Sequence, residues 1–139
     1  MLDVVLDTNV LVASLRSKRG ASRRILESVG TGQWQLNISV ALALEYEDVM
    51  KRPNLLPGFS DTDVDDFLDY LFSASNLVPF VRRQRPSLPD PDDDRILEVA
   101  LQCRAVIVTH NMKDFAGVER LGIAVERPAD FLRSIGANR

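Results

Sequence analysis

The sequence predicts an α/β protein with a central, mainly parallel sheet. Short apolar runs that suit buried strands alternate along the chain with segments whose apolar residues recur at helical spacing. Of the 139 residues, 45% are hydrophobic and 27% are charged, which is the composition of an ordinary globular protein. This length suits one domain with a substantial core, so we expect a single domain over residues 1–139.

An aspartate directly follows the first predicted strand. Val4 to Leu6 are apolar and fit a short buried strand, Asp7 comes next, and an apolar helical pattern begins at Val10. In open parallel sheets, ligands and metals bind just beyond the carboxyl ends of strands, so Asp7 would face a crevice. Alternatively, Asp7 only caps the helix that follows it. The local sequence leaves both interpretations open.

The later elements follow the same alternation. Ser39, Ser60 and Asp90 are each predicted to cap a helix, Ser60 together with Asp63 and Asp90 with Pro91 at the first helical position. Further strands are expected at residues 34–38, 77–81, 105–108 and 123–125. Helices are expected at residues 10–15, 22–29 and 40–51, after residues 60 and 90, and at 128–135, with a loop at 82–91 and a turn or short helix at 111–115.

The composition excludes several classes of protein. Cys103 is the only cysteine, so an intramolecular disulfide is excluded and a cytoplasmic location is expected. His110 is the only histidine, which excludes a multi-histidine zinc site within one chain. No apolar run approaches the length of a membrane span, and the first residues lack the basic segment of a secretory signal. We therefore expect no association with a membrane.

The charges are unevenly distributed, although the net charge is only −3. Residues 16–24 contain no acid, and a second basic group occupies residues 82–85. Acids concentrate at residues 61–69 and 90–94. The first basic group fits either a surface that binds nucleic-acid phosphates or a solvated loop, and both interpretations stay open. It comprises Arg16, Lys18, Arg19, Arg23 and Arg24.

Two further acids lie where helical periodicity predicts an apolar face. Glu45 shares a face with apolar residues of its helix, and Asp93 stands at the start of the apolar stripe of the helix after Asp90. A buried charge is costly unless it is paired or bound to a metal. At one edge of the sheet, Asp7, Glu45 and Asp93 would raise one another's pKa, and Mg²⁺ or Mn²⁺ would relieve the repulsion. Alternatively, Glu45 pairs with an arginine and Asp93 only favours its helix N-terminus.

Four motifs follow one another along the chain. The first is Leu6-Asp7-Thr8-Asn9-Val10-Leu11, and the second is Ser39 with Glu45 and Arg52-Pro53. The third is Asp90-Pro91-Asp92-Asp93-Asp94 running into Leu97 and Ala100, and the fourth is Ile107-Val108-Thr109-His110-Asn111 with Asp114-Phe115. Any one motif is weak, but the ordered set spans nearly the whole chain and resembles the motifs of the PIN-domain family, in particular the VapC-like toxins of toxin–antitoxin pairs.

The resemblance implies a PIN-like three-layer α/β/α domain that acts as an endoribonuclease dependent on Mg²⁺ or Mn²⁺. By position, Asp7, Glu45 and Asp93 correspond to the acidic metal ligands of the family. No side-chain nucleophile is needed, because a metal-activated water can hydrolyse the RNA phosphodiester. The resemblance further implies a cognate antitoxin protein and a homodimer.

The sequence departs from the family pattern after the strand that ends in Thr109. Asn111 stands where family members often have a fourth acid, and Asp114, three residues later, is the predicted substitute among the catalytic acids. Thr8, Asn9, Thr109 and Asn111 are expected to shape the site without coordinating strongly. The basic residues 16–24 would line the RNA groove.

Two other functions compete with the nuclease. The Asn111 departure favours a catalytically inactive PIN-like module that binds RNA or a protein. A receiver or phosphoryl-transfer domain would also place an aspartate after its first strand. The absence of a paired acid directly beside Asp7, and of a fitting lysine after the strand ending in Thr109, argues against that class.

Overall fold

Five parallel strands form the centre of the molecule. A computed structural model describes residues 1–79, 81 and 88–136. All neighbouring strands are parallel, and their order across the sheet is β3-β2-β1-β4-β5. The predicted parallel α/β fold is confirmed. The strands are β1 (Leu2–Leu6), β2 (Trp34–Ser39), β3 (Asn76–Val78), β4 (Val106–Val108) and β5 (Val125–Glu126).

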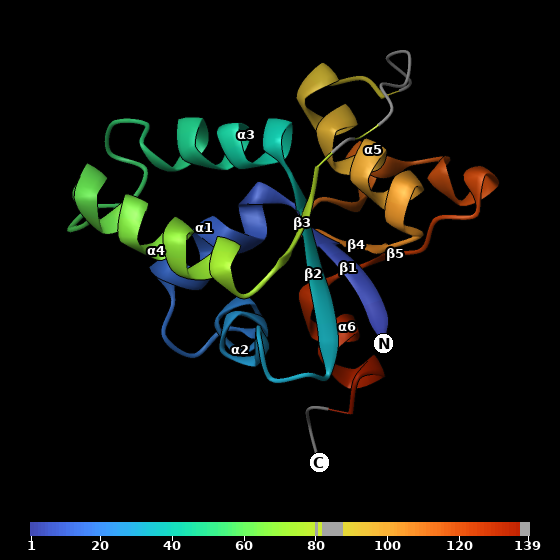
Figure 1. The fold of residues 1–139 in the computed structure, drawn as a ribbon, viewed down its shortest axis with the longest axis horizontal. Coiled ribbons are helices and arrows are strands. Elements are labelled where there is room, and N and C mark those ends of the chain that lie inside the picture. The colour runs from blue at the N-terminus through green and yellow to red at the C-terminus, as the bar shows by residue number, and fades with distance from the viewer. Residues whose placement is uncertain (80, 82–87, 137–139) are drawn as a thin grey trace.

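Helices cover both faces of the sheet. Figure 1 shows α1, α2 and α4 on one side and α5 on the other, which gives three layers. Among the described residues, no helix is both long enough and apolar enough to cross a membrane. The helices are α1 (Thr8–Arg16), α2 (Ala21–Ser28), α3 (Val40–Met50), α4 (Asp61–Ser73), α5 (Asp94–Cys103) and α6 (Pro128–Ser134), with 3₁₀ segments η1 (Pro91–Asp93), η2 (Met112–Phe115) and η3 (Val118–Leu121).

The direction of the chain across the sheet reverses beside β1. From β1 the chain continues to β2 and β3 on one side, and then crosses to β4 and β5 on the other. Such a reversal opens a crevice at the carboxyl ends of the two strands that flank it, here β1 and β4. Leu6 is in register with Val108, so the segments that begin with Asp7 and Thr109 leave the sheet at the same level.

The three predicted helix caps are confirmed. The Ser39 hydroxyl accepts a hydrogen bond from the backbone of α3 at 3.1 Å. Ser60 and Asp63 form a reciprocal capping box at the start of α4. The Asp90 carboxylate accepts from the Asp92 backbone N–H at 3.0 Å, with Pro91 at the first position. The first turn after Asp90 is 3₁₀, so α5 itself begins later than the pattern suggested.

Some predicted boundaries were wrong. β3 is shorter than the expected strand at 77–81, of which residue 80 lies outside the described residues. The last strand lies two residues beyond the expected start at 123, because Val125 is the residue that pairs with Ile107 while Ile123 is buried before the strand. The 3₁₀ segment η3 has no periodic signal and was not predicted. Most of the expected loop at 82–91, including Arg82, Arg83 and Arg85, lies outside the described residues.

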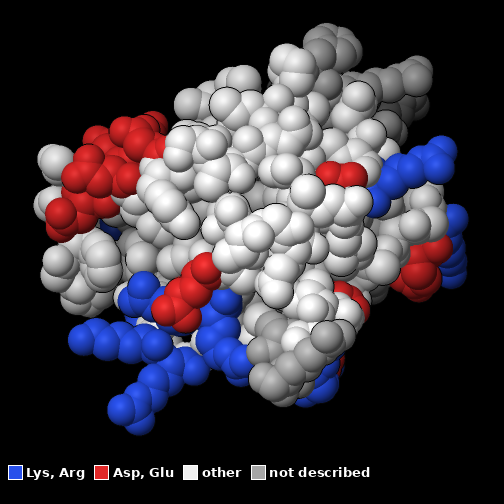
Figure 2. All heavy atoms as spheres, turned by 60° about the horizontal axis from the view of Figure 1, so that its bottom comes forward, with Lys and Arg blue, Asp and Glu red and all other residues white. Residues whose placement is uncertain are grey.

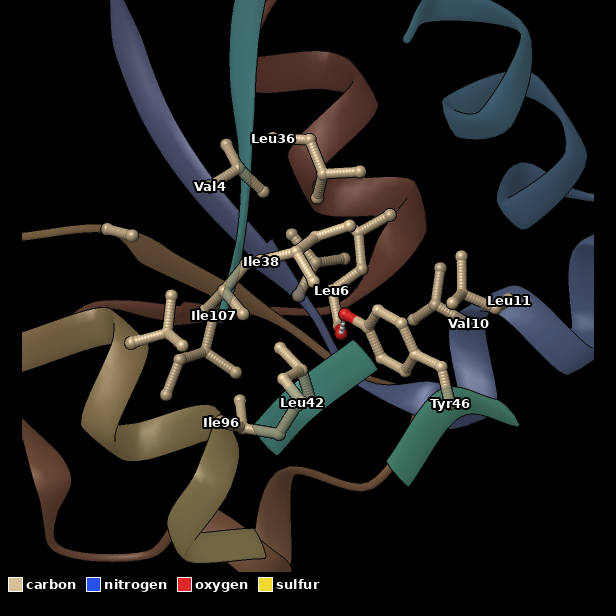
Figure 3. Packing of buried hydrophobic residues seen from close by; sticks show 14 of the residues in the cluster. Val4, Leu6, Val10, Leu11, Leu36, Ile38, Leu42, Tyr46, Ile96 and Ile107 are labelled. Carbon is tan, nitrogen blue, oxygen red and sulfur yellow. Dashed lines mark hydrogen bonds between the residues drawn. The ribbon is translucent and has the colours of Figure 1, made fainter. Parts of the chain in front are cut away.

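A buried tyrosine connects the end of β1 to α3. The Tyr46 side chain is fully buried among apolar residues, and its hydroxyl donates a hydrogen bond to the Leu6 carbonyl (Figure 3). Burial raises the pKa of Tyr46 well above its usual range, so the hydroxyl remains a donor. This bond satisfies the carbonyl of the residue before Asp7 and thereby fixes the end of the central strand.

Replacing Tyr46 by Phe is expected to lower the free energy of unfolding by about 1–2 kcal/mol, because it leaves the buried Leu6 carbonyl without a partner. Urea unfolding of the metal-free protein measures the change. The matched control is Tyr70→Phe, since Tyr70 lies on α4 with half of its surface exposed (51%). Equal stability of the two variants would show that the bond contributes nothing.

Candidate metal centre

Three carboxylates from separate parts of the chain meet at the crevice beside β1. Asp7 follows β1, Asp93 ends η1, and Asp114 lies in η2 beyond β4. One carboxylate oxygen of each lies within 4.8 Å of the others. The topology therefore brings together acids that are far apart in the sequence, as the strand-end argument requires.

Asp7 is buried and held by side chains of the neighbouring segment. It occupies the N-cap position of α1, but its side chain makes no hydrogen bond that meets the geometry of a helix cap. Instead, Thr109 Oγ1 donates to Asp7 Oδ2 at 2.8 Å, and Asn9 Nδ2 donates to the same oxygen at 3.2 Å. Burial raises the pKa of Asp7, and the hydrogen bond from Thr109 opposes that rise.

Asn9 and Thr109 also hold the two segments after β1 and β4 together. Asn9 Nδ2 donates to Thr109 Oγ1 at 3.3 Å, and Asn9 Oδ1 accepts from the His110 backbone N–H at 3.2 Å. The Asn111 backbone N–H donates to Thr109 Oγ1 at 3.0 Å, while the residue itself is exposed. Thr8, also predicted to shape the site, lines the adjacent cavity. These contacts set the direction of the Asp7 carboxylate.

Among the three carboxylates, Asp93 gives the most direct indication that a cation binds here. Its Oδ2 atom is buried and has no hydrogen-bond partner among the residues that the structure describes. Burial, followed by repulsion from Asp7 and Asp114, raises the pKa of Asp93 to about 7. A bound divalent cation would satisfy this oxygen and relieve the repulsion. A donor set made only of carboxylate oxygens fits Mg²⁺ or Mn²⁺ better than Zn²⁺.

Glu45 lies on the wall of the same crevice but outside the group of three. Its helix directs Leu42, Tyr46 and Met50 into the core, so Glu45, one position before Tyr46, stands at the edge of that stripe and is half-buried. Burial and repulsion from Asp92 raise the pKa of Glu45. The crevice has a volume of about 170 Å³ and is lined by Asp7, Thr8, Glu45, Val49, Arg52, Asp90, Asp92, Asp93 and Ile96.

The sequence did not predict two features near this site. Asp94, the residue directly after Asp93, has only 4% of its surface exposed. Glu98, one turn further along α5, is also buried and forms an ion pair with Arg95 at 3.1 Å. Asp94 and Glu98 are four residues apart and share a helical face with Leu97. This spacing could have indicated that both acids are buried.

The basic group at residues 16–24 lies on the surface. Lys and Arg side chains gather at the corner of the molecule where Figure 1 places α2 and its connection to α1 (Figure 2). Arg16, Lys18, Arg19 and Arg24 are exposed, and Arg23 is half-buried. Ser22, within this group, is buried, and its hydroxyl lies 2.7 Å from His110 Nε2. His110 thus connects the basic group to the segment that carries Thr109.

Comparisons with known proteins agree with this architecture. A family model for the PIN domain matches residues 3–113. VapBC2 from Rickettsia felis, bound to a DNA fragment from its promoter, contains a similar chain with 17% identity and a TM-score of 0.64, covering 91% of this chain and 98% of that chain. DNA-bound VapBC from Salmonella typhimurium gives 17% identity and a TM-score of 0.65, covering 92% and 99%.

VapBC-1 from nontypeable Haemophilus influenzae is similar to the same extent. It shares 16% identity with a TM-score of 0.62 and covers 92% of this chain and 99% of that chain. At such low identity these structures establish the fold. No curated protein sequence matches the chain.

In metal-free buffer, Asp93→Asn is expected to stabilise the protein at high pH. The folded pKa of Asp93, about 7, lies above the ordinary aspartate pKa of 3.8, so the wild type loses stability as the pH rises between these values. The gain in the free energy of unfolding of Asp93→Asn over the wild type is therefore absent near pH 4 and complete above about pH 7. Because Asp93 is only half-buried, solvent screening limits the gain to about 1–2 kcal/mol.

Urea unfolding in EDTA from pH 4 to 8 measures this difference. Asp66→Asn is the matched control, because Asp66 is exposed on α4. If wild type and Asp93→Asn depend on pH in the same way, the carboxylates do not repel one another as described.

Proposed function

The chain belongs to the PIN-domain family, and on that premise we propose that it is a metal-dependent endoribonuclease, the toxin of a toxin–antitoxin pair. The observation that carries the proposal is the close approach of Asp7, Asp93 and Asp114 around a buried carboxylate oxygen to which no other described residue donates a hydrogen bond. The reaction is hydrolysis of an RNA phosphodiester: the water oxygen bonds to phosphorus, one ester P–O bond breaks, and the leaving oxygen takes up a proton.

The three clustered carboxylates would hold Mg²⁺ or Mn²⁺, with Glu45 close enough to line the same crevice. Once bound, such an ion lowers the pKa of a water and offsets the charge of the phosphate. Thr109 and Asn9 orient the Asp7 carboxylate through their hydrogen bonds. Burial raises the pKa of Glu45, which suits it to accept the proton that the water loses.

The basic group at residues 16–24 supports RNA as the substrate. Exposed Lys and Arg side chains bind phosphates without reading sequence. The contact of Ser22 with His110, the residue after Thr109, supports a route from this group to the carboxylates. It is the reason we propose phosphate binding for this group and not merely a solvated loop.

The antitoxin and a second copy of the chain are the proposed partners in the cytoplasm. An apolar groove of about 480 Å³ adjoins the crevice and suits an apolar segment of an antitoxin; Asn9, Val12, Ala13, Arg16, Ser17, Val49 and Leu55 line it. Solved VapBC complexes with similar chains support such a partner. Exposed Val40 and Leu44 on α3 and Leu77 on β3 are apolar surface for a homodimer.

The alternative is a catalytically inactive PIN-like module that binds RNA or a protein. The exposed Asn111 at the position expected to hold an acid is the feature that favours it. The presence of Asp114 in the carboxylate group weakens this alternative, because a third acid is available without Asn111.

We expect the protein to cleave single-stranded RNA in Mg²⁺ or Mn²⁺, with EDTA stopping the reaction and excess metal restoring it. Asp7→Asn and Asp93→Asn should each reduce the rate by more than about 100-fold, since even outer partners of metal ligands cost 10–100-fold. Gel analysis of labelled RNA measures cleavage, and urea unfolding shows that the variants fold. Asp66→Asn should cleave normally. RNA binding without cleavage by the wild type would favour the inactive module.

The geometry also predicts whether Asp114 or Glu45 contributes more to metal binding. Asp114→Asn should weaken Mn²⁺ binding more than Glu45→Gln, because Asp114 belongs to the close group and Glu45 to the wall. Isothermal titration calorimetry with Mn²⁺ compares these two isosteric variants. If Glu45→Gln instead weakens Mn²⁺ binding more than Asp114→Asn does, Glu45 is a direct metal ligand, as its position in the sequence suggested.

A further inference from the structure

One positive charge lines a crevice that is otherwise acidic. Asp7, Glu45, Asp90, Asp92 and Asp93 line it, and Arg52 is the only basic side chain among its described lining residues. An RNA phosphodiester carries a negative charge and would meet repulsion from every other charged group there. The chain's own means of attracting a phosphate to this point is therefore the Arg52 guanidinium.

The backbone after α3 separates Arg52 from its basic neighbour. Lys51, the C-cap residue of α3, faces α4. Its Nζ lies 2.6 Å from Asp65 of α4 and 3.3 Å from Glu47 of its own helix. The Arg52 backbone N–H donates to the Val49 carbonyl at 3.1 Å, a final turn that places the side chain on the wall of the crevice. The helix that carries Glu45 thus also positions Arg52.

The guanidinium is held loosely. Within the described part of the chain its ion pair is with Asp48, at 3.3 Å and between side chains that are 56% and 69% exposed. Exposed pairs of this kind contribute less than about 1 kcal/mol. The contact occupies one nitrogen of a planar group with five N–H donors, so the group can turn to a stronger anion without losing a costly interaction.

We propose that Arg52 binds the non-bridging oxygens of the scissile RNA phosphate, and that Asp48 holds it beside the crevice until RNA arrives. This proposal rests on the nuclease function proposed above. A guanidinium matches two phosphate oxygens with two parallel hydrogen bonds, which a lysine ammonium cannot reproduce. Arg52 therefore supplies the charge stabilisation on the side of the phosphate that faces α3.

The competing role for Arg52 is structural. Burial raises the pKa of Glu45 and the guanidinium partly opposes that rise, so Arg52 could serve only to hold the acidic wall together. The two roles differ in what they predict for metal binding. A phosphate contact is dispensable for binding a cation, whereas a support for the carboxylates is not.

The test compares Arg52→Gln and Arg52→Lys with the matched variant Arg133→Gln. Arg133 likewise forms an exposed ion pair with an aspartate of its own helix, α6. That helix packs against the first residue of β2, since the rings of Phe131 and Trp34 lie 5.5 Å apart, so it is at the opposite end of the strands from the crevice. Calorimetry measures Mn²⁺ affinity, and fluorescence anisotropy measures binding of labelled mixed-sequence RNA in Ca²⁺, with a gel to verify that the strand is intact.

Arg52→Gln is expected to weaken RNA binding about 10-fold, the equivalent of one charge-assisted contact, and to slow cleavage in Mg²⁺ about 100-fold. Its Mn²⁺ affinity should be unchanged or higher. Arg52→Lys should fall between Arg52→Gln and the wild type, and Arg133→Gln should match the wild type. Unchanged RNA binding in Arg52→Gln, or a parallel loss of Mn²⁺ affinity, would overturn the proposal. If the wild type does not cleave RNA, the nuclease function fails, and the RNA-binding comparison still decides whether Arg52 holds a phosphate.

Discussion

Repulsion between carboxylates held close together is the constraint on which the rest of the structure depends. Asp7, Asp93 and Asp114 each offer an oxygen within 4.8 Å of the others, and without a cation such a group opposes folding. The fold maintains it because β1, at the centre of the sheet, is buried, and its last residue is tied to α3 through Tyr46. The stability of the core thereby keeps in place an arrangement that is unfavourable on its own.

The polar contacts around the site hold one carboxylate firmly and leave another unsatisfied. Thr109 and Asn9 fix the Asp7 carboxylate, and their further bonds join the segments after β1 and β4. Asp93, in contrast, has an oxygen to which no described residue donates a hydrogen bond. One acid is thus oriented by the protein and another is left unsatisfied, which is the pattern expected where a bound cation would complete the coordination.

The sequence predicts the fold, and it predicts the acids that follow directly from strand ends and helix starts. Asp7 could be placed because a parallel sheet gathers its carboxyl ends at one edge, and Asp93 because a charge stood at the start of an apolar stripe. The position of Glu45 could not be fixed, because one residue along a helix turns a side chain by about 100° and decides between core and wall. The position of Asp114 could not be predicted from periodicity, because it depends on the path of η2, a short 3₁₀ turn that leaves no periodic pattern in the sequence. The same absence of periodicity hid η3 and the register of β5.

The distribution of charge explains how a protein with a net charge of −3 can suit an anionic substrate. The acids at the crevice would repel RNA as long as no cation is bound, so metal binding and RNA binding at this point must be coupled. Attraction then has to come from separate local groups: the basic residues of α2 and its connection on one flank, and Arg52 at the crevice itself. Figure 2 shows acidic side chains above the basic corner, on the side where Figure 1 places α4. On the proposed function, an RNA strand would therefore approach from the basic corner, past His110 and its contact with Ser22, toward the carboxylates.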